Sequence, residues 1–420
     1  MPDSTPQNKI DKVTEELARG AEISIINLFD QLIETAYFRR ASDIHIDPLA
    51  SCLRIRFRID GVLTDAYSFP KEISSEVIAR IKILSKLRTD EHQATQDGRF
   101  RYTFSEEILK QSADTNQFID FRVSIVPTYH GENCVMRLLS GKNEQVSLDD
   151  LGFSETDQKK IQEAMKKTNG MILSTGPTGS GKTTTMYTLI KMLNSPEVSI
   201  VTIEDPIEYA IDDIEQIQVN ARHGLTFANG LRSILRQDPN IIMVGEIRDA
   251  ETASIAVNTA LTGHLLLSTL HTNDAATTLP RLLDMGIEEY LVSSTVSLAI
   301  GQRLVRQICK DCKEQIPITH AMKEALLKTP YSSLLLNNDF VYKGKGCDKC
   351  GNSGYRGRIC INEVLVADAE IKEAILRRAS AAEIKKIAIK NGMTTMFEDG
   401  FNKVKKGLTT VEEVLRVIHE

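Results

Sequence analysis

Hydrophobic residues in the N-terminal third of the chain follow two different periods. Apolar residues three or four positions apart predict amphipathic helices over residues 23–38 and 73–88. Alternating or short apolar runs predict strands, which fall in three segments: 53–60, 118–126 and 134–139. We therefore expect a short helical segment over residues 1–37 and an α+β domain over residues 38–140.

The first of these strands has a basic face. From Leu53 onward, apolar side chains alternate with three arginines: Arg54, Arg56 and Arg58. Asp60-Gly61 then favours a hairpin turn, because both residue types tolerate a positive φ. The basic face predicts a surface exposed to solvent or to a neighbouring subunit, and it is also the best candidate surface for a nucleic acid.

The pattern changes after residues 141–150, a polar segment that we interpret as a linker. Short, wholly apolar runs then end in polar residues and are separated by helical stretches. These runs are residues 171–173, 200–203, 241–244 and 265–267. Such runs are typical of parallel strands buried on both faces, so they predict an α/β core over residues 151–308.

Composition and charge add little to this picture. The chain has 420 residues, 41% of them hydrophobic and 26% charged, which suits a globular protein of two or three domains. A net charge of -6 argues against a dedicated nucleic-acid binder. No apolar stretch is long enough to cross a bilayer, and residues 1–20 lack a signal-peptide core. We therefore expect a cytosolic protein unless a partner holds it at a membrane.

A phosphate-binding loop is the clearest chemical signal. Residues 176–183 fit G-x-x-x-x-G-K-[ST] completely, between a predicted strand and a predicted helix. Lys182 is expected to reach the β- and γ-phosphates of ATP, and the Thr183 hydroxyl to bind Mg²⁺. The alternative is a chance glycine-rich turn. The predicted nucleotide-binding residues are Gly176, Pro177, Thr178, Gly179, Ser180, Gly181, Lys182, Thr183 and Thr184.

Polar residues with catalytic potential follow three of the buried runs. Glu246 stands where P-loop ATPases place an acid that holds Mg²⁺ or polarises the attacking water. The usual aspartate is replaced by Gly245, so Glu246 serves alone or shares the work with Glu204 on the neighbouring strand. His271 is a candidate for sensing the γ-phosphate, with His264 a weaker one. The alternatives are a surface acid for Glu246 and a structural histidine for His271.

Four of the seven cysteines form two Cys-x-x-Cys pairs: Cys309, Cys312, Cys347 and Cys350. Two such pairs suit a closed, tetrahedral, structural Zn²⁺ site, although redox-active or simply reduced pairs are the alternative. We expect the metal to organise residues 309–364. Short helices are expected over residues 365–420, the last beginning at Thr410 with Glu413 completing a capping box.

These motifs stand in an order that resembles the secretion ATPases, the motors of type II secretion and type IV pilus assembly. Around the phosphate-binding loop, the matching motifs are residues 202–208, 245–249 and 263–273. Upstream, three motifs resemble the second N-terminal domain of that family: residues 41–45, 58–62 and 96–99. The likeness spans about residues 40–370.

The resemblance implies a homo-hexamer whose subunits join a PAS-like N-terminal domain to a RecA-like ATPase domain and a zinc-binding, helical C-terminal region. It implies that Glu246 is the catalytic carboxylate and that Glu204 and His271 support it. It also implies that Arg99 and Arg122 reach the nucleotide across the gap between domains, with structural ion pairing as the alternative. The expected ligands are ATP, Mg²⁺ and Zn²⁺.

The cysteine module marks the assembly and export motors of this family. The resemblance therefore implies a cytosolic ATPase, held at the inner membrane by partners, whose hydrolysis moves an inner-membrane platform protein. Because only about 40 residues precede the second N-terminal domain, we expect the usual first domain to be missing or reduced. Two alternatives stay open: a nucleic-acid-translocating RecA-like motor and a nucleotide-binding scaffold that does not hydrolyse. We expect no nucleic-acid partner.

Overall fold

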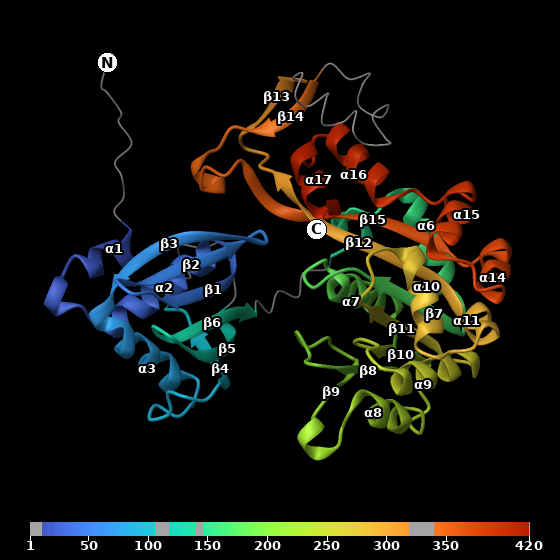
Figure 1. Cartoon of the computed structure of the whole chain (residues 1–420), viewed down its shortest axis with the longest axis horizontal. Coiled ribbons are helices and arrows are strands. Elements are labelled where there is room, and N and C mark those ends of the chain that lie inside the picture. The colour runs from blue at the N-terminus through green and yellow to red at the C-terminus, as the bar shows by residue number, and fades with distance from the viewer. Residues whose placement is uncertain (1–10, 106–116, 140–145, 319–339, 420) are drawn as a thin grey trace. The chain divides into compact units, whose positions relative to one another are not determined.

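The chain folds into two compact units that divide after residue 142. The computed structural model describes residues 11–105, 117–139, 146–318 and 340–419 (Figure 1). Within these ranges, none of the helices combines the length and apolar character that crossing a membrane requires.

The N-terminal unit is a six-stranded antiparallel sheet with helices packed on it. The strand order is β3-β2-β1-β6-β5-β4. The strands are β1 (Ala41–Pro48), β2 (Cys52–Ile59), β3 (Val62–Pro70), β4 (Gln96–Thr103), β5 (Phe118–Thr128) and β6 (Gly131–Leu139). The helices are α1 (Lys12–Leu17), α2 (Ile25–Phe38) and α3 (Ser74–Leu84). Both predicted helices and all three predicted strands are thus confirmed.

The hairpin between β2 and β3 and the apolar face of α2 show why the sequence folds this way. Asp60 and Gly61 have φ values of 50° and 87°, which the two-residue turn requires. Leu28 and Phe29 of α2 are buried in the same core as Ile44 of β1. The helix therefore belongs to the core of this unit.

The second unit is built on a seven-stranded sheet with the order β15-β12-β7-β11-β10-β8-β9. Its strands are β7 (Gly170–Thr175), β8 (Ile200–Glu204), β9 (Glu215–Gln218), β10 (Ile241–Val244), β11 (Leu265–Leu270), β12 (Val296–Ile308) and β15 (Tyr355–Val366). All neighbours are parallel except β12 and β15. The four apolar runs are confirmed as parallel strands, and their carboxyl ends lie at one edge of the sheet.

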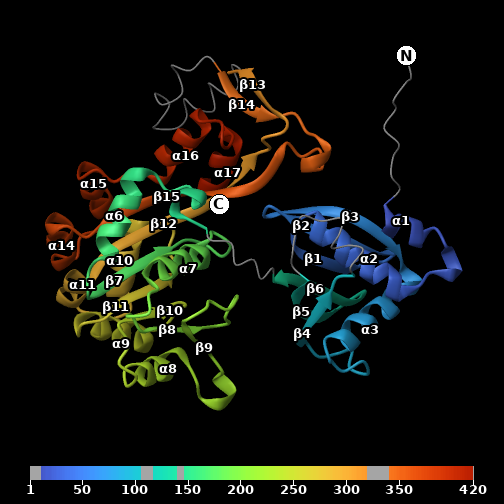
Figure 2. The same ribbon diagram turned by 180° about the vertical axis from the view of Figure 1, so that it is seen from behind.

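Helices cover both faces of this sheet, as Figures 1 and 2 show from opposite sides. One face packs on α5 (Leu148–Leu151), α6 (Glu155–Met165) and α7 (Lys182–Leu193). The other packs on α8 (Phe227–Ile234), α9 (Ala250–Leu261), α10 (Ala275–Asp284), α11 (Glu289–Thr295), α14 (Ala369–Leu376) and α15 (Ala381–Lys390). A capping box between Ser147 and Asp150 starts α5 inside the segment expected to be a linker.

The C-terminal part adds a small hairpin and two helices. β13 (Lys313–Pro317) pairs with β14 (Phe340–Gly344), and α16 (Met396–Lys405) and α17 (Val411–His419) share a core with β12 and β15. The finer sequence-based domain divisions, after residues 308 and 364, stay predictions.

The predicted capping box at the start of α17 is half wrong. The Glu413 backbone N–H does donate to the Thr410 hydroxyl, over 3.4 Å. The Glu413 carboxylate, however, accepts hydrogen bonds from Arg306 and Arg416. Burial favours the neutral acid, but these arginine hydrogen bonds outweigh burial and lower the pKa of Glu413 to about 2.

Candidate functional site

The phosphate-binding loop connects β7 to α7, at the carboxyl edge of the sheet. Gly176 has a φ of 149°, and a Cβ atom there would lie 2.6 Å from the Gln302 carbonyl oxygen. Only glycine fits that position. Thr183 and Thr184 are exposed in the first turn of α7, where backbone N–H groups and the helix dipole favour an anion.

Lys182 is buried within the curl of this loop. Its Nζ donates to the carbonyl oxygens of Gly176, at 2.8 Å, and Pro177, at 3.0 Å. Burial lowers the pKa of Lys182 to about 8, with Glu246 opposing that shift and Arg303 adding to it. The ammonium is therefore a cation that a phosphate group would stabilise.

Glu246 and His271 lie side by side at the same edge of the sheet. The Glu246 Oε2 atom is 3.1 Å from His271 Nε2, and the Oε1 atom is 2.5 Å from a guanidinium nitrogen of Arg248. Because the charge of Glu246 also acts on Lys182, the structure brings these three site residues together. The sequence did not predict Arg248 as a site residue, although it lies only two residues from Glu246. The weaker candidate His264 instead lies 3.1 Å from the Thr259 carbonyl oxygen.

Glu204 ends β8 and is almost fully buried. Its carboxylate accepts hydrogen bonds from Thr202 at 2.6 Å, from Gln216 at 3.2 Å and from the Tyr187 hydroxyl. Burial raises the pKa of Glu204, and these three hydrogen bonds oppose the rise. Glu204 is thus tied to α7 and β9, whereas Glu246 is the carboxylate in contact with His271.

Residues of β12 hold the phosphate-binding loop from the neighbouring strand. Gln302 donates to the Ser180 carbonyl oxygen at 2.9 Å and accepts from the Ser174 hydroxyl at 3.2 Å. Arg303 donates to the Asn273 carbonyl oxygen at 2.8 Å. Sequence reasoning missed Gln302 and Arg303, because only strand pairing reveals that β12 lies beside β7.

In the N-terminal unit, Arg99 of β4 and Arg122 of β5 are directly opposed cross-strand partners. Arg122 is in turn opposite Arg137 of β6, which pairs with Asp43 at 2.9 Å. We call Arg99, Arg122 and Arg137 the arginine row. Arg99 is exposed, and like charges directly opposite one another on neighbouring strands are unfavourable.

The arginines of β2 have acidic partners in the adjacent strand β1. Arg54 and Arg56 lie 3.7 and 2.6 Å from Asp47, and Arg58 lies 3.6 Å from Asp43. Asp43 and Asp47 therefore offset part of the positive charge on this face.

The four paired cysteines come together after β12 and beside the turn at Asp348–Cys350. Sulfur–sulfur distances are 3.8 Å for Cys309–Cys347, 3.9 Å for Cys312–Cys350 and 3.7 Å for Cys347–Cys350. A tetrahedral zinc site with bonds of about 2.3 Å places its sulfurs about 3.8 Å apart. The donor set and its spacing therefore fit Zn²⁺.

Comparison with known proteins links these features to one family. The family described as "Type II/IV secretion system protein" matches residues 19–416. Type II secretion system protein E of Xanthomonas campestris is 45% identical over 402 residues, covering 96% of this chain and 68% of that protein. Type IV pilus assembly ATPase PilB of Thermus thermophilus is 45% identical over 385 residues, covering 92% of this chain and 42% of PilB.

Solved structures confirm the predicted fold class. The pilus retraction motor PilT with bound ADP has a TM-score of 0.59 and 25% identity, covering 92% of this chain and 96% of PilT. The ATPase DotB of Legionella pneumophila has a TM-score of 0.66 and 22% identity, covering 93% of this chain and 95% of DotB. The second likeness concerns the fold alone.

Proposed function

The chain belongs to the type II/IV secretion system protein family and is an ATP hydrolase, and we propose that it powers assembly of a type IV pilus or a type II secretion pseudopilus. The contact between Glu246 and His271, at the same sheet edge as Lys182, supports ATP hydrolysis most directly, and the 45% identical relatives support the role in pilus or pseudopilus assembly. The site thus combines Lys182, a cation suited to binding phosphate, with the Glu246 carboxylate held by His271, and ATP hydrolysis requires both groups.

We propose that residues 176–184 enclose the triphosphate of ATP, with Lys182 exchanging its loop carbonyl partners for phosphate oxygens. Bound Mg²⁺ supplies charge neutralisation on the phosphates, and Thr183 would hold it. Glu246 polarises the attacking water, while His271 fixes the orientation of the Glu246 carboxylate.

The roles of the remaining predicted site residues are also proposals. Arg99 and Arg122 would supply positive charge to the nucleotide, from the same subunit or from a neighbour, and the arginine row supports this. Glu204 would support catalysis through α7, the helix that begins with Lys182, because its carboxylate accepts from Tyr187 of that helix.

Assembly and metal binding complete the proposal. We propose a homo-hexamer that acts on an inner-membrane platform protein from the cytoplasmic side. Zn²⁺ held by the four cysteines would be structural, because all four positions of a tetrahedral site are filled by protein.

A nucleic-acid-translocating motor is the other function weighed from the sequence. Its best surface was the basic face of β2, and the acidic partners of those arginines argue against it. Stimulation of ATP turnover by DNA, with a steep dependence on salt, would favour that motor instead.

The test is the Glu246→Gln variant, assayed for ATP binding and for turnover with magnesium. We expect ATP affinity to be retained and turnover to fall roughly 100-fold or more, since the amide cannot act as a base. The matched control is Glu251→Gln, which changes a largely exposed carboxylate on α9. Unchanged turnover in Glu246→Gln, or wild-type rings that bind ATP without hydrolysing it, would refute the proposal.

A further inference from the structure

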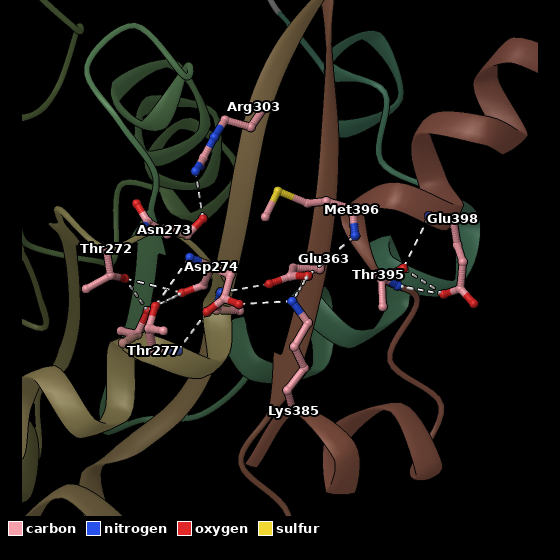
Figure 3. A network of polar contacts seen from close by, with 12 residues as sticks. Thr272, Asn273, Asp274, Thr277, Arg303, Glu363, Lys385, Thr395, Met396 and Glu398 are labelled. Carbon is pink, nitrogen blue, oxygen red and sulfur yellow. Dashed lines mark hydrogen bonds and ion pairs between the residues drawn. The ribbon is translucent and has the colours of Figure 1, made fainter. Parts of the chain in front are cut away.

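A single buried carboxylate links two helices that are distant in the sequence. Glu363 lies on β15 and is fully buried. Its Oε1 atom accepts the Ala275 N–H at 2.8 Å, and its Oε2 atom accepts the Met396 N–H at 3.4 Å (Figure 3). Ala275 begins α10 and Met396 begins α16, so one side chain caps both helices.

The hydrogen bond from Ala275 to Glu363 depends on a glycine in the neighbouring strand β12, because any side chain there would occupy the same space. Gly301 of β12 is the cross-strand partner of Glu363. A Cβ atom on Gly301 would lie 2.8 Å from the Ala275 nitrogen and 3.0 Å from Glu363 Cγ. On its other side Gly301 is paired with Thr175, the residue before the phosphate-binding loop. The carboxylate is thus two strands away from that loop.

A lysine from α15 reinforces the same helix start. Lys385 donates to Asp274 Oδ2 at 2.9 Å and lies 3.9 Å from Glu363 Oε2. Asp274 is the N-cap of α10 and accepts the Thr277 N–H at 2.9 Å. Figure 3 shows these side chains converging on the first turn of α10 from β15 and α15. The start of α10 is therefore held from the C-terminal part of the chain.

The loop just before α10 carries the proposed catalytic contact. His271, three residues before the N-cap, lies against Glu246. The next residue, Thr272, has its N–H 3.0 Å from the Thr175 hydroxyl oxygen and its own hydroxyl 2.5 Å from it. Only Thr272 and Asn273 stand between His271 and the N-cap Asp274, so a two-residue segment, anchored to Thr175, joins His271 to the start of α10.

We propose that Glu363 is a positioning residue for ATP hydrolysis, which fixes the start of α10 and thereby keeps His271 against Glu246. The inference rests on the proposed roles of Glu246 and His271. Because Glu363 and Lys385 reach α10 from β15 and α15, these two elements of the C-terminal part become part of the turnover machinery. Displacing β15 or α15 from the start of α10 would change the rate of hydrolysis without touching the nucleotide.

Glu363→Gln is the first test. Glutamine keeps the shape but offers one acceptor oxygen, so its NH₂ group must face one of the two backbone N–H donors. We expect kcat to fall roughly 10- to 100-fold, as small misplacements of catalytic groups do. ATP affinity should stay within about twofold, since Lys182 and its loop are unchanged.

Asp399→Asn is the matched control. Asp399 is also buried, pairs with Lys403 and accepts the N–H of Asn362, the neighbour of Glu363 on β15. Within the part of the chain that the structure describes, however, Asp399 makes no hydrogen bond or ion pair with α10. If Asp399→Asn lowers kcat as much as Glu363→Gln at equal loss of thermal stability, the role of Glu363 is only structural and the inference is overturned.

Lys385→Met keeps the inference testable if Glu363→Gln does not fold, because the Lys385 side chain is 35% exposed. We expect the same signature, a lower kcat with ATP affinity retained, and a wild-type kcat would overturn the inference. A wild-type protein that binds ATP but shows no turnover would instead refute the proposed function. The two failures are therefore distinguishable.

Discussion

Lys182 should make ATP binding depend on pH in an unusual range. Its pKa is lowered to about 8 in the nucleotide-free chain, mainly by burial. A bound triphosphate favours the charged ammonium and raises that pKa again. Binding above pH 8 must therefore take up a proton, and affinity should fall as the pH rises.

The size of the effect follows from the fraction of charged lysine. With a pKa of about 8, roughly 90% of Lys182 is charged at pH 7 and roughly 10% at pH 9. Affinity for ATP should thus weaken about ninefold to tenfold between these values, which is close to 1.4 kcal/mol. An unperturbed lysine would give almost no change over the same range.

Isothermal titration calorimetry of the full chain with ATP at pH 7, 8 and 9 measures this directly. A titration of ATP alone over the same pH range is the control, because it reports the protonation of the nucleotide. If the affinity of the wild-type chain for ATP, corrected by this control, does not change between pH 7 and pH 9, the lowered pKa of Lys182 is refuted.

Three further predictions concern stability and metal binding. Cys347→Ser should release zinc from the purified chain, measured by elemental analysis, and lower the melting temperature while ATP affinity is kept. Glu413→Gln should cost about 2 kcal/mol in urea unfolding at pH 7. Because the pKa of Glu413 is about 2 in the folded chain against 4.5 unperturbed, this stabilisation is present above about pH 4.5 and lost as pH falls toward 2. Tyr187→Phe should cost about 1–3 kcal/mol in the same assay, because it removes a donor from buried Glu204. The first prediction would be contradicted if Cys347→Ser retained zinc. The other two would be contradicted if Glu413→Gln or Tyr187→Phe unfolded at the same urea concentration as the wild-type chain.

The sequence predicted the parts of this protein that local pattern determines. Wholly apolar runs marked the four central parallel strands, and the phosphate-binding motif needs only eight consecutive residues. The cysteine pairs were likewise readable from their spacing. In each case neighbouring residues carry the chemistry, so no knowledge of the fold was required.

The parts that escaped prediction depend on pairing between distant segments. Glu363 lies 88 residues from Ala275, and Gln302 lies 122 residues from Ser180. Nothing in the pattern around Glu363 distinguishes it from a surface acid. The sequence could not show that β15 turns back antiparallel to β12, which is what buries that carboxylate beside the start of α10.

β12 is one strand of 13 residues that starts beside the amino end of β7, passes the phosphate-binding loop at Gln302 and continues to the cysteine cluster. Gln302 on this strand donates a hydrogen bond to the phosphate-binding loop, and Cys309 is the first residue after the end of β12. At about 3.3 Å per residue, the two points are roughly 23 Å apart. Hydrogen bonding to β15 stiffens almost all of that length. A displacement of the cysteine cluster along this strand would therefore be passed to the phosphate-binding loop through one continuous strand, without an intervening loop.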